Sequence, residues 1–398
     1  MDFEFDPFSR EFFDDPTEIY ARLRDEAPCY HSEKWDFYAF SRYDDVVATS
    51  RDTKTFTSTH GLTYEQLTDP NFDVAMTQSM IMMDPPEHTR YRRLVSRTFS
   101  QRYIDEREPL VRRTMARYLE RLAGAGEFDL VDDFCGPFPV EIICAILGVP
   151  EADRQMIRHQ TDTMLTREEG SAVGGQAQAE AAIAQAVYFL GLVADKRKHP
   201  GDDMCSDLLA AELPNEAGEV STLTDNEVAG FMSLLGAAGS ETVTKAVGSA
   251  AVLFHRNPDE WAKVVAERSR IPAAAEEVLR YWAPSQYQGR MSTTESTWHG
   301  VTIPAGKPVF LLTGAANHDP RQYDRPDAFD IDREQKMPLT FGHGIHRCIG
   351  EALARLEINV ALDEIATRWP KFRVDESGLE RVQMSNVAGY SRVPVVVG

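Results

Sequence analysis

The stretch Phe341-Gly342-His343-Gly344-Ile345-His346-Arg347-Cys348-Ile349-Gly350 decides the fold of this chain. Its glycines allow tight bends and let the backbone approach a flat ligand, which side chains would block. A helical pattern follows over residues 351–369, so Cys348 lies near a helix N-terminus, where the helix dipole and free N–H groups favour a thiolate. The segment therefore indicates a cysteine that is used as an anion.

Three other interpretations of this segment stay open at this point. It could be a glycine-rich turn with a buried cysteine. It could be a zinc site with His343, His346 and Cys348 as ligands, although no second ligand cluster completes it. It could be a cysteine nucleophile with His346 as base, which needs an orienting group and oxyanion donors that a sequence does not show.

The composition describes a large acidic protein. The 398 residues are 42% hydrophobic, enough for a core that encloses a sizeable cofactor. A net charge of −21 argues against nucleic-acid binding, which relies on clustered Lys and Arg, and favours solubility. Five widely spaced cysteines do not suggest a disulfide scaffold. The N-terminus is acidic and broken by proline, and no apolar run approaches the roughly 20 residues of a membrane span, so we expect a cytoplasmic protein with no membrane span.

Periodicity predicts a mainly helical protein with small β-sheets. No repeat or long linker divides the chain, so residues 1–398 are expected to form a single domain. The best-defined helix starts at a capping box, Thr224 to Glu227, and runs to Asn257; at about 1.5 Å per residue it is near 48 Å long and central. Other helices are expected over about 86–99, 104–123, 140–147, 151–165 and 176–196, and strands at 37–40, 296–302, 308–312 and 392–397.

A second unusual segment lies inside the long helix: Ala238-Gly239-Ser240-Glu241-Thr242. The long helix holds four glycines, each of which costs up to roughly 1 kcal/mol relative to Ala: Gly230, Gly236, Gly239 and Gly248. A Glu in an apolar helix is costly to bury unless it is paired or protonated. The glycines could simply permit close packing, with Glu241 facing solvent. Alternatively, the helix widens locally where a small ligand sits, with an acid and an alcohol beside it.

Two further segments carry charge at helical spacing. Glu277 and Arg280 are three residues apart and can pair on one helix face, although such pairs are common on surfaces. His88 and Arg92, in a helix that begins near Pro86, share a face and could clamp an anion. The alternative for this second helix is a solvated basic face.

Together the four segments resemble the cytochrome P-450 family. The first is similar to its haem-binding loop, F-x-x-G-x-x-x-C-x-G, at Phe341, Gly344, Cys348 and Gly350. Ala238 to Thr242 resembles its acid–alcohol pair, and Glu277 with Arg280 its E-x-x-R ion pair. The segments follow the family's order over about residues 80–355. One departure is Ala328, at a position where the family often supplies an Arg partner to the ion pair; Arg333 lies nearby in sequence.

The resemblance implies a cytochrome P-450 fold, with haem b between the long central helix and the helix after the cysteine loop. Cys348 would be the iron ligand, with Phe341 packed beside the sulfur and Ala238 beside the haem. Glu241 and Thr242 would deliver protons to dioxygen, and Gly239 would leave room for it. The propionate ligands would be His88, Arg92, Arg290 and His346.

The function implied is a monooxygenase that uses O2 to hydroxylate or epoxidise an apolar small molecule. No flavin or nicotinamide fingerprint appears, so electrons would come from a ferredoxin or flavodoxin with an NAD(P)H reductase, docking on the basic residues Arg92, Arg93, Arg347 and Arg355. A peroxide-driven peroxygenase, a haem-based sensor or binding protein, and a zinc- or cysteine-dependent hydrolase are the rivals. The substrate stays open; segments expected to line its pocket are 58–83, 164–190, 285–288 and 385–388, with Met80, Met82, Gln286, Tyr287 and Val387 as candidate contacts.

Overall fold

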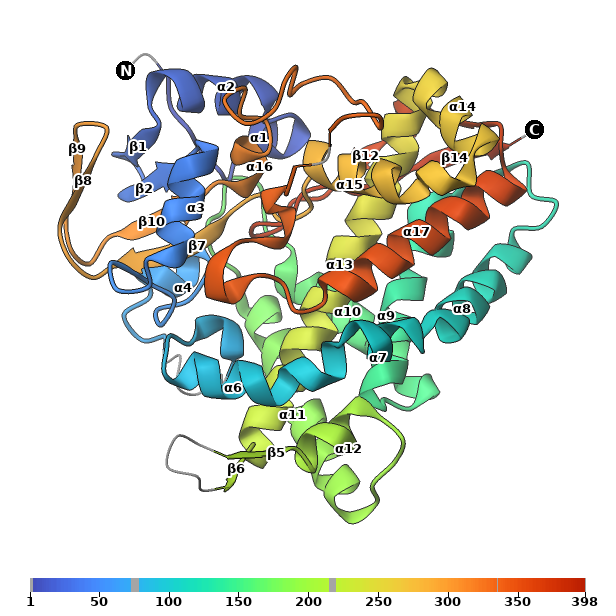
Figure 1. Ribbon diagram of the computed structural model, residues 1–398, viewed down its shortest axis with the longest axis horizontal. Helices are drawn as coiled ribbons and strands as arrows, with labels where there is room; N and C mark the ends of the chain where they lie inside the picture. Colours follow the sequence, from blue (N-terminus) through green and yellow to red (C-terminus); the bar gives the residue numbers. More distant parts are fainter. Residues whose placement is uncertain (1–2, 73–78, 215–219, 335, 398) are drawn as a thin grey trace.

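The longest element, α13 (Asp225–Arg256), crosses the middle of the helical part of the molecule (Figure 1). It begins at the predicted capping box, in which Thr224 accepts from the Glu227 N–H and the Glu227 carboxylate accepts from the Thr224 N–H. It ends at Asn257, because Pro258 starts the next helix. Helices α9, α10, α11, α15 and α17 pack around it, so the prediction of a long central helix is confirmed.

The computed structural model describes residues 3–72, 79–214, 220–334 and 336–397. The other helices in this part are α1 (Arg10–Asp14), α2 (Thr17–Glu26), α3 (Tyr43–Arg51), α4 (Tyr64–Thr68), α6 (Glu87–Val95), α7 (Gln101–Asp105), α8 (Glu108–Arg121), α9 (Pro137–Leu147), α10 (Arg154–Leu165), α11 (Gln176–Lys198), α12 (Met204–Leu209), α14 (Pro258–Ala266), α15 (Ile271–Tyr281), α16 (Thr313–Ala316) and α17 (Glu351–Arg368).

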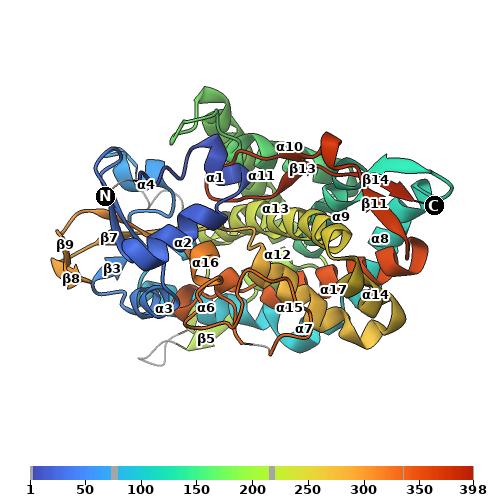
Figure 2. The ribbon, with the colours of Figure 1, turned by 90° about the horizontal axis from the view of Figure 1, so that it is seen from above.

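The strands are short and form small sheets beside the helical body (Figures 1 and 2). A five-stranded sheet has the order β1 (Cys29–Ser32), β2 (Phe37–Phe40), β10 (Pro308–Leu311), β7 (Gln288–Ser292) and β3 (Phe56–Thr57). Only β2 and β10 are parallel in it. The remaining strands are β4 (Glu127–Asp129), β5 (Glu212–Pro214), β6 (Val220–Thr222), β8 (Ser296–Trp298), β9 (Val301–Ile303), β11 (Phe372–Val374), β12 (Glu380–Arg381), β13 (Tyr390–Arg392) and β14 (Pro394–Val397).

Some expected boundaries were wrong, for identifiable reasons. The single strand expected over 296–302 is a hairpin, because His299 and Gly300 adopt φ of 50° and 81°, as a two-residue β-turn requires. The helix expected over 104–123 is interrupted between α7 and α8, where Pro109 lies in the first turn of α8 and lacks an N–H. The helix expected over 86–99 ends in a 3₁₀ turn from Ser96.

One helix in the described part of the chain, α11, is long and apolar enough to cross a membrane by length and composition. Its sequence has no uninterrupted apolar run of that length; frequent alanines raise its mean hydropathy to 1.3. In the structure α11 packs along α10 and α13, with 22% of its apolar window buried. The helix is therefore an outer layer of the helical body.

Candidate functional site

The cysteine loop is shaped by glycines and closed by one backbone hydrogen bond. Gly342 and Gly344 adopt φ of 68° and 70°, and a Cβ on Gly344 would collide with the carbonyl oxygen of Ser50. The N–H of Cys348 donates to the carbonyl of Phe341 at 2.8 Å. Gly350 directly precedes α17, which begins at residue 351. The loop thus holds Cys348 close to the start of α17, as predicted.

The Cys348 sulfur differs from the other four cysteines because Cys348 is accessible while they are buried. The surrounding protein nevertheless desolvates the sulfur and so raises the pKa of its thiol, against the lowering effects of the Gly350 N–H, Arg92 and Arg355. The N–H group near the helix N-terminus favours the thiolate, as expected, but desolvation outweighs this effect. A thiolate at this position needs a further positive partner, such as a bound metal ion.

Four basic side chains, here called the basic cradle, come from separate segments toward the same loop: His88 and Arg92 of α6, Arg290 of β7, and His346. The His88 and His346 rings lie 4.6 Å apart, and His346 Nε2 is 3.1 Å from Ser58 Oγ. Arg92 acts electrostatically on Cys348, and Arg290 on His346. The structure thus brings together the four residues that the sequence suggested for one anion.

The basic cradle holds buried nitrogen groups that burial makes harder to protonate. His88 and Arg290 are 3% and 5% exposed, and His88 Nε2 is buried without a hydrogen-bond partner among the described residues. Burial, with repulsion from Arg92, lowers the pKa of His88 to about 4, and burial lowers the pKa of Arg290 to about 10. Buried donors of this kind are stable when an anion accepts from them. A ligand with carboxylate groups would accept hydrogen bonds from these buried donors.

The central helix presents one open stripe toward the interior. Ala238 is exposed and Thr242 partly exposed, one turn apart on a helix that is otherwise mostly buried there. The Thr242 hydroxyl donates to the Ala238 carbonyl at 3.1 Å. A Cβ on Gly239 would lie 3.0 Å from Ile143 Cγ1, so this glycine lets α9 approach α13; its role in leaving room for oxygen stays a prediction.

The Glu241 side chain does not lie on the open stripe formed by Ala238 and Thr242. Glu241 is 2% exposed, and its Oε2 lies 3.0 Å from Nζ of Lys245, which is also buried. Consecutive helical residues are turned by about 100°, so Glu241 and Thr242 face different neighbours. Glu241 also interacts with Asp162 of α10. The solvent-facing alternative for Glu241 is therefore excluded. The i,i+4 spacing of Glu241 and Lys245 is the sequence pattern that indicates this pair.

The predicted ion pair is buried behind the cysteine loop. Arg280 Nε and Nη2 donate to Glu277 at 2.7 and 2.8 Å, and both side chains are at most 3% exposed. Arg333 Nε lies 3.3 Å from Glu277 Oε1, and its Nη2 donates to the Ala328 carbonyl at 2.8 Å. Arg333 therefore supplies the third charge that Ala328 lacks.

This ion pair is linked to the loop by Asn317. Arg280 Nη1 donates to the Asn317 carbonyl at 2.9 Å, and Asn317 Oδ1 accepts from the Leu339 N–H at 2.7 Å. Asn317 Nδ2 donates to Thr340 Oγ1 at 2.9 Å. Since Thr340 precedes Phe341, the ion pair supports the entry to the loop.

The residues suggested for the substrate pocket are dispersed. Met82 lines a cavity of about 900 Å³ together with Leu67, Met83, Arg90 and Glu227. Met80 is packed in the main core, and residues 73–78 of the suggested segment 58–83 lie outside the described residues. A substrate role for Met80 and Met82 stays a prediction.

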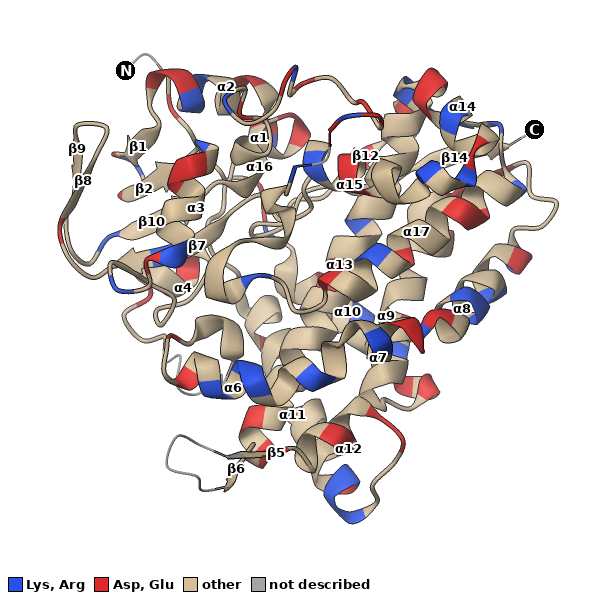
Figure 3. Ribbon diagram, in the orientation of Figure 1, with Lys and Arg blue, Asp and Glu red and all other residues tan. Residues whose placement is uncertain are grey.

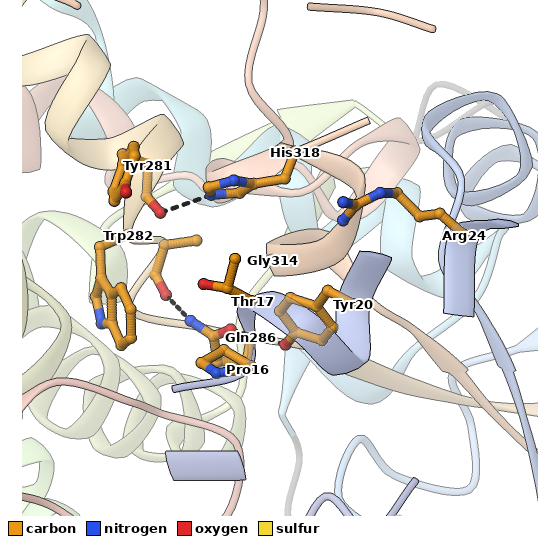
Figure 4. A pocket seen from close by; sticks show the side chains of 10 residues that line it. Pro16, Thr17, Tyr20, Arg24, Tyr281, Trp282, Gln286, Gly314 and His318 are labelled. Atoms are coloured by element: carbon orange, nitrogen blue, oxygen red, sulfur yellow. Dashed lines mark hydrogen bonds between the residues drawn. The ribbon is translucent and has the colours of Figure 1, made fainter. Parts of the chain in front are cut away.

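Three further candidates lie near the N-terminal helices or the C-terminal turn. Gln286 accepts from the Tyr20 hydroxyl at 2.8 Å beside a small pocket under α2 (Figure 4). The Tyr287 hydroxyl donates to the Ser385 carbonyl at 2.7 Å, and Val387 packs with Met384. These bonds give Gln286 and Tyr287 structural partners; their role at a substrate stays a prediction.

The residues present fit a haem. The accessible Cys348 sulfur offers one axial ligand, the basic cradle offers donors for two carboxylates, and the open stripe at Ala238 and Thr242 offers a side-chain-poor face for a flat ring. For the zinc alternative, the described residues contain no group of three or more His, Cys, Asp or Glu that could hold a metal ion.

Comparison with known proteins gives one consistent family. The family model described as cytochrome P-450 matches residues 178–385. Cytochrome P-450 130 of Mycobacterium tuberculosis is 36% identical over 386 residues, covering 95% of this chain and 94% of the relative. A mutant of P-450 EryK in complex with erythromycin B has a TM-score of 0.86 at 32% identity, covering 96% and 95% of the two chains. P-450BioI in complex with an acyl carrier protein ligated to hexadec-9Z-enoic acid has a TM-score of 0.87 at 28% identity, covering 98% and 100%.

Removing one member of the buried ion pair should destabilise the fold strongly. We expect Glu277→Gln to lower the free energy of unfolding by about 3–5 kcal/mol, because it leaves Arg280 and Arg333 buried without their anion. The neighbouring Glu276→Gln is the matched control, since its partner Arg355 is partly exposed, and should cost at most about 1 kcal/mol. Denaturant unfolding of both variants measures the difference, and equal losses would contradict the assigned role.

Proposed function

The chain belongs to the cytochrome P-450 family of haem b oxidoreductases, and we propose that it is a monooxygenase that inserts one oxygen atom from O2 into an apolar small molecule. The observation that carries the proposal is the accessible sulfur of Cys348 beside the basic cradle, whose buried His88 has a ring nitrogen without a partner among the described residues. Haem b supplies the oxygen and electron chemistry when it is bound. The chain's own residues hold the ring, position the substrate and move protons.

The residues that would bind the haem are of two kinds, an axial ligand to the iron and the basic cradle for the propionates. Cys348 would ligate the iron, with its N–H bound to the Phe341 carbonyl, and the Arg355 guanidinium lies 4.6 Å from the Phe341 ring centre. His88, Arg92, Arg290 and His346 would donate to the propionates, which relieves their desolvation. Thr242, on the open stripe of α13, would hold a proton donor at the reaction side of the ring.

Two observations bear on the substrate class: the ligands of the similar solved structures and the lining of the cavity beside Met82. The neighbouring structures hold erythromycin B and a fatty acyl group on a carrier protein, two different kinds of molecule. In this chain's cavity Leu67, Met82 and Met83 lie beside polar and charged residues, among them the Arg90–Glu227 ion pair. The mixed lining narrows the substrate no further than the family does, so the apolar class of the proposed substrate rests on the resemblance to the family.

Electrons would come from a separate ferredoxin or flavodoxin in the cytoplasm. The family uses redox partners, and the distribution of free charge supports one docking side. Arg347 and Arg355 are engaged by Glu351 and Glu276, so they contribute less free charge than the sequence suggested. Exposed arginines on α6 and the turn after it, Arg93 and Arg97, carry the basic character of this side (Figure 3).

The first test is the carbon monoxide difference spectrum of the reduced protein. Wild type should show the absorption band of a thiolate-ligated haem, and Cys348→Ser should lose it, because an alcohol is a poor anionic ligand. Cys205→Ala, which removes a buried cysteine, should keep the band. The proposal would be contradicted if the purified protein held no porphyrin or if Cys348→Ser kept an unchanged band.

The second test concerns the hydroxyl of Thr242. In Thr242→Ala we expect product per electron pair to fall by on the order of 10- to 100-fold, with more peroxide released, because a positioned proton donor is lost. Thr244→Val is the control, since that hydroxyl donates to the Cys135 carbonyl on the buried side of the same helix. Unchanged coupling in Thr242→Ala would show that the hydroxyl has no part in proton delivery.

The third test concerns docking. Reversing Arg93 and Arg97 to Glu should slow reduction by an acidic ferredoxin on the order of 10-fold at low salt, and the rate should then depend less on ionic strength. Arg373→Glu, on β11 in a sheet remote from α6, is the control (Figure 2). If both variants are reduced at the wild-type rate, the partner docks elsewhere.

A further inference from the structure

The outer face of α11 exposes large apolar side chains to solvent. Ile183 and Val187 are 64% and 62% exposed, and Leu190 is 43% exposed. Charged residues normally cover the outer face of a surface helix, yet Glu180 is the single charged residue over 176–194, in a chain that is 26% charged. A contiguous apolar face of this kind marks a surface that another molecule covers.

The exposed side chains form one line along the helix. Steps of three and four residues keep them on the same side of α11, and all of them are exposed. We call this line the α11 stripe: Glu180, Ile183, Val187, Leu190, Ala194 and Lys198. The spacing is the one with which two helices pack along each other.

The α11 stripe lies away from the cysteine loop. The opposite side of α11 is buried against α10 and α13 through Phe189, Leu192 and Val193. Figure 2 shows α10 and α11 on one side of α13 and α17, which follows the cysteine loop, on the other. The molecule that covers the stripe is therefore not a ligand of the haem site.

The two ends of the stripe carry opposite charges. Glu180 lies in the second turn of α11, where it accepts a hydrogen bond from Gln176 at 2.7 Å, and Lys198 is the last residue of the helix. Neither has an ion pair within the described residues. If two copies of α11 run antiparallel, Glu180 of each copy lies beside Lys198 of the other, so the stripe is complementary to its own copy.

The middle of the stripe fits the same arrangement. Val187 and Leu190 lie equally far from the midpoint of the stripe, as do Ile183 and Ala194, so each residue meets the other member of its pair across the contact. The small Ala194 and the exposed Gly191 beside it let the two helices approach closely. Each apolar contact would occur twice, once on either side of a two-fold axis.

A membrane surface is the other occupant that suits an apolar helix face. Anionic lipid headgroups attract Lys and Arg, whereas this chain has a net charge of −21. At the basic end of α11, Lys196 and Arg197 are already paired with Asp203 and Asp225. The charge of the chain therefore favours a second copy over a lipid surface.

We propose that the α11 stripe is a homodimer interface, in which two copies of this chain pair their α11 helices antiparallel about a two-fold axis near residues 188 and 189. Apolar contacts in the middle supply the affinity, and the charges at the two ends set the direction of pairing. The proposal does not depend on the proposed monooxygenase function.

Sedimentation velocity of the full-length, haem-loaded protein tests the interface. Wild type should change from monomer to dimer as its concentration rises through the micromolar range, as is usual for a small interface. Val187→Glu should weaken the dimer by at least the order of 10-fold, because it places two carboxylates in an apolar contact. Val220→Glu is the matched control, since Val220 is 67% exposed on β6, outside the stripe. Circular dichroism checks that both variants are folded.

Reversing the charges tests the direction of pairing. At low salt, Glu180→Lys and Lys198→Glu should each weaken the dimer on the order of 10-fold, because both copies of the ion pair become repulsive. The double variant with both substitutions should dimerise as wild type does, since opposite charges meet again. A parallel pair would not recover in this way, because like residues would then face each other.

Three results would overturn the proposal: wild type that stays monomeric throughout the micromolar range, Val187→Glu that dimerises as wild type does, and a double variant that does not recover. Vesicles of phosphatidylcholine and phosphatidylglycerol test the other occupant. We expect wild type to stay in solution when the vesicles are sedimented. Binding to vesicles that is lost in Val187→Glu would assign the stripe to lipid and contradict the homodimer.

Discussion

The constraint on which this structure depends is that a sulfur anion has to be kept at one point inside an apolar fold. Burial alone raises the pKa of Cys348, so the sulfur is stable as an anion only beside positive charge and donated hydrogen bonds. The glycine conformations at 342 and 344 fix the path of the loop, and Arg92 and Arg355 place positive charge near the sulfur. The loop geometry and the surrounding arginines therefore serve the same end.

A loop of this kind needs a rigid support, because it is built from glycines and short 3₁₀ turns. The buried ion pair supplies it through Asn317, which connects Arg280 to the backbone that enters the loop. Burying Glu277 with two arginines is costly unless their donors are satisfied, and backbone carbonyls accept from both guanidinium groups. The ion pair is thus better explained as a positioning device than as a source of net stability.

The sequence predicted what lies within a few residues. The cysteine loop, the capping box at Thr224 and the Glu277–Arg280 pair are local patterns, and the structure contains each of them. It did not predict contacts between distant segments: Arg333 completes the ion pair from 56 residues away, and Asp162 meets Glu241 across two helices. Such contacts depend on how helices pack, which no local pattern records.

The central helix shows why an acid and an alcohol next to each other in sequence do different work. A turn of about 100° between neighbours sends Thr242 to the open stripe and Glu241 into the interface with α10. Burial penalises the Glu241 carboxylate, and the charge of Lys245 beside it lowers its pKa. The separation of the two groups is therefore a consequence of helix geometry that the charge distribution around Glu241 makes useful.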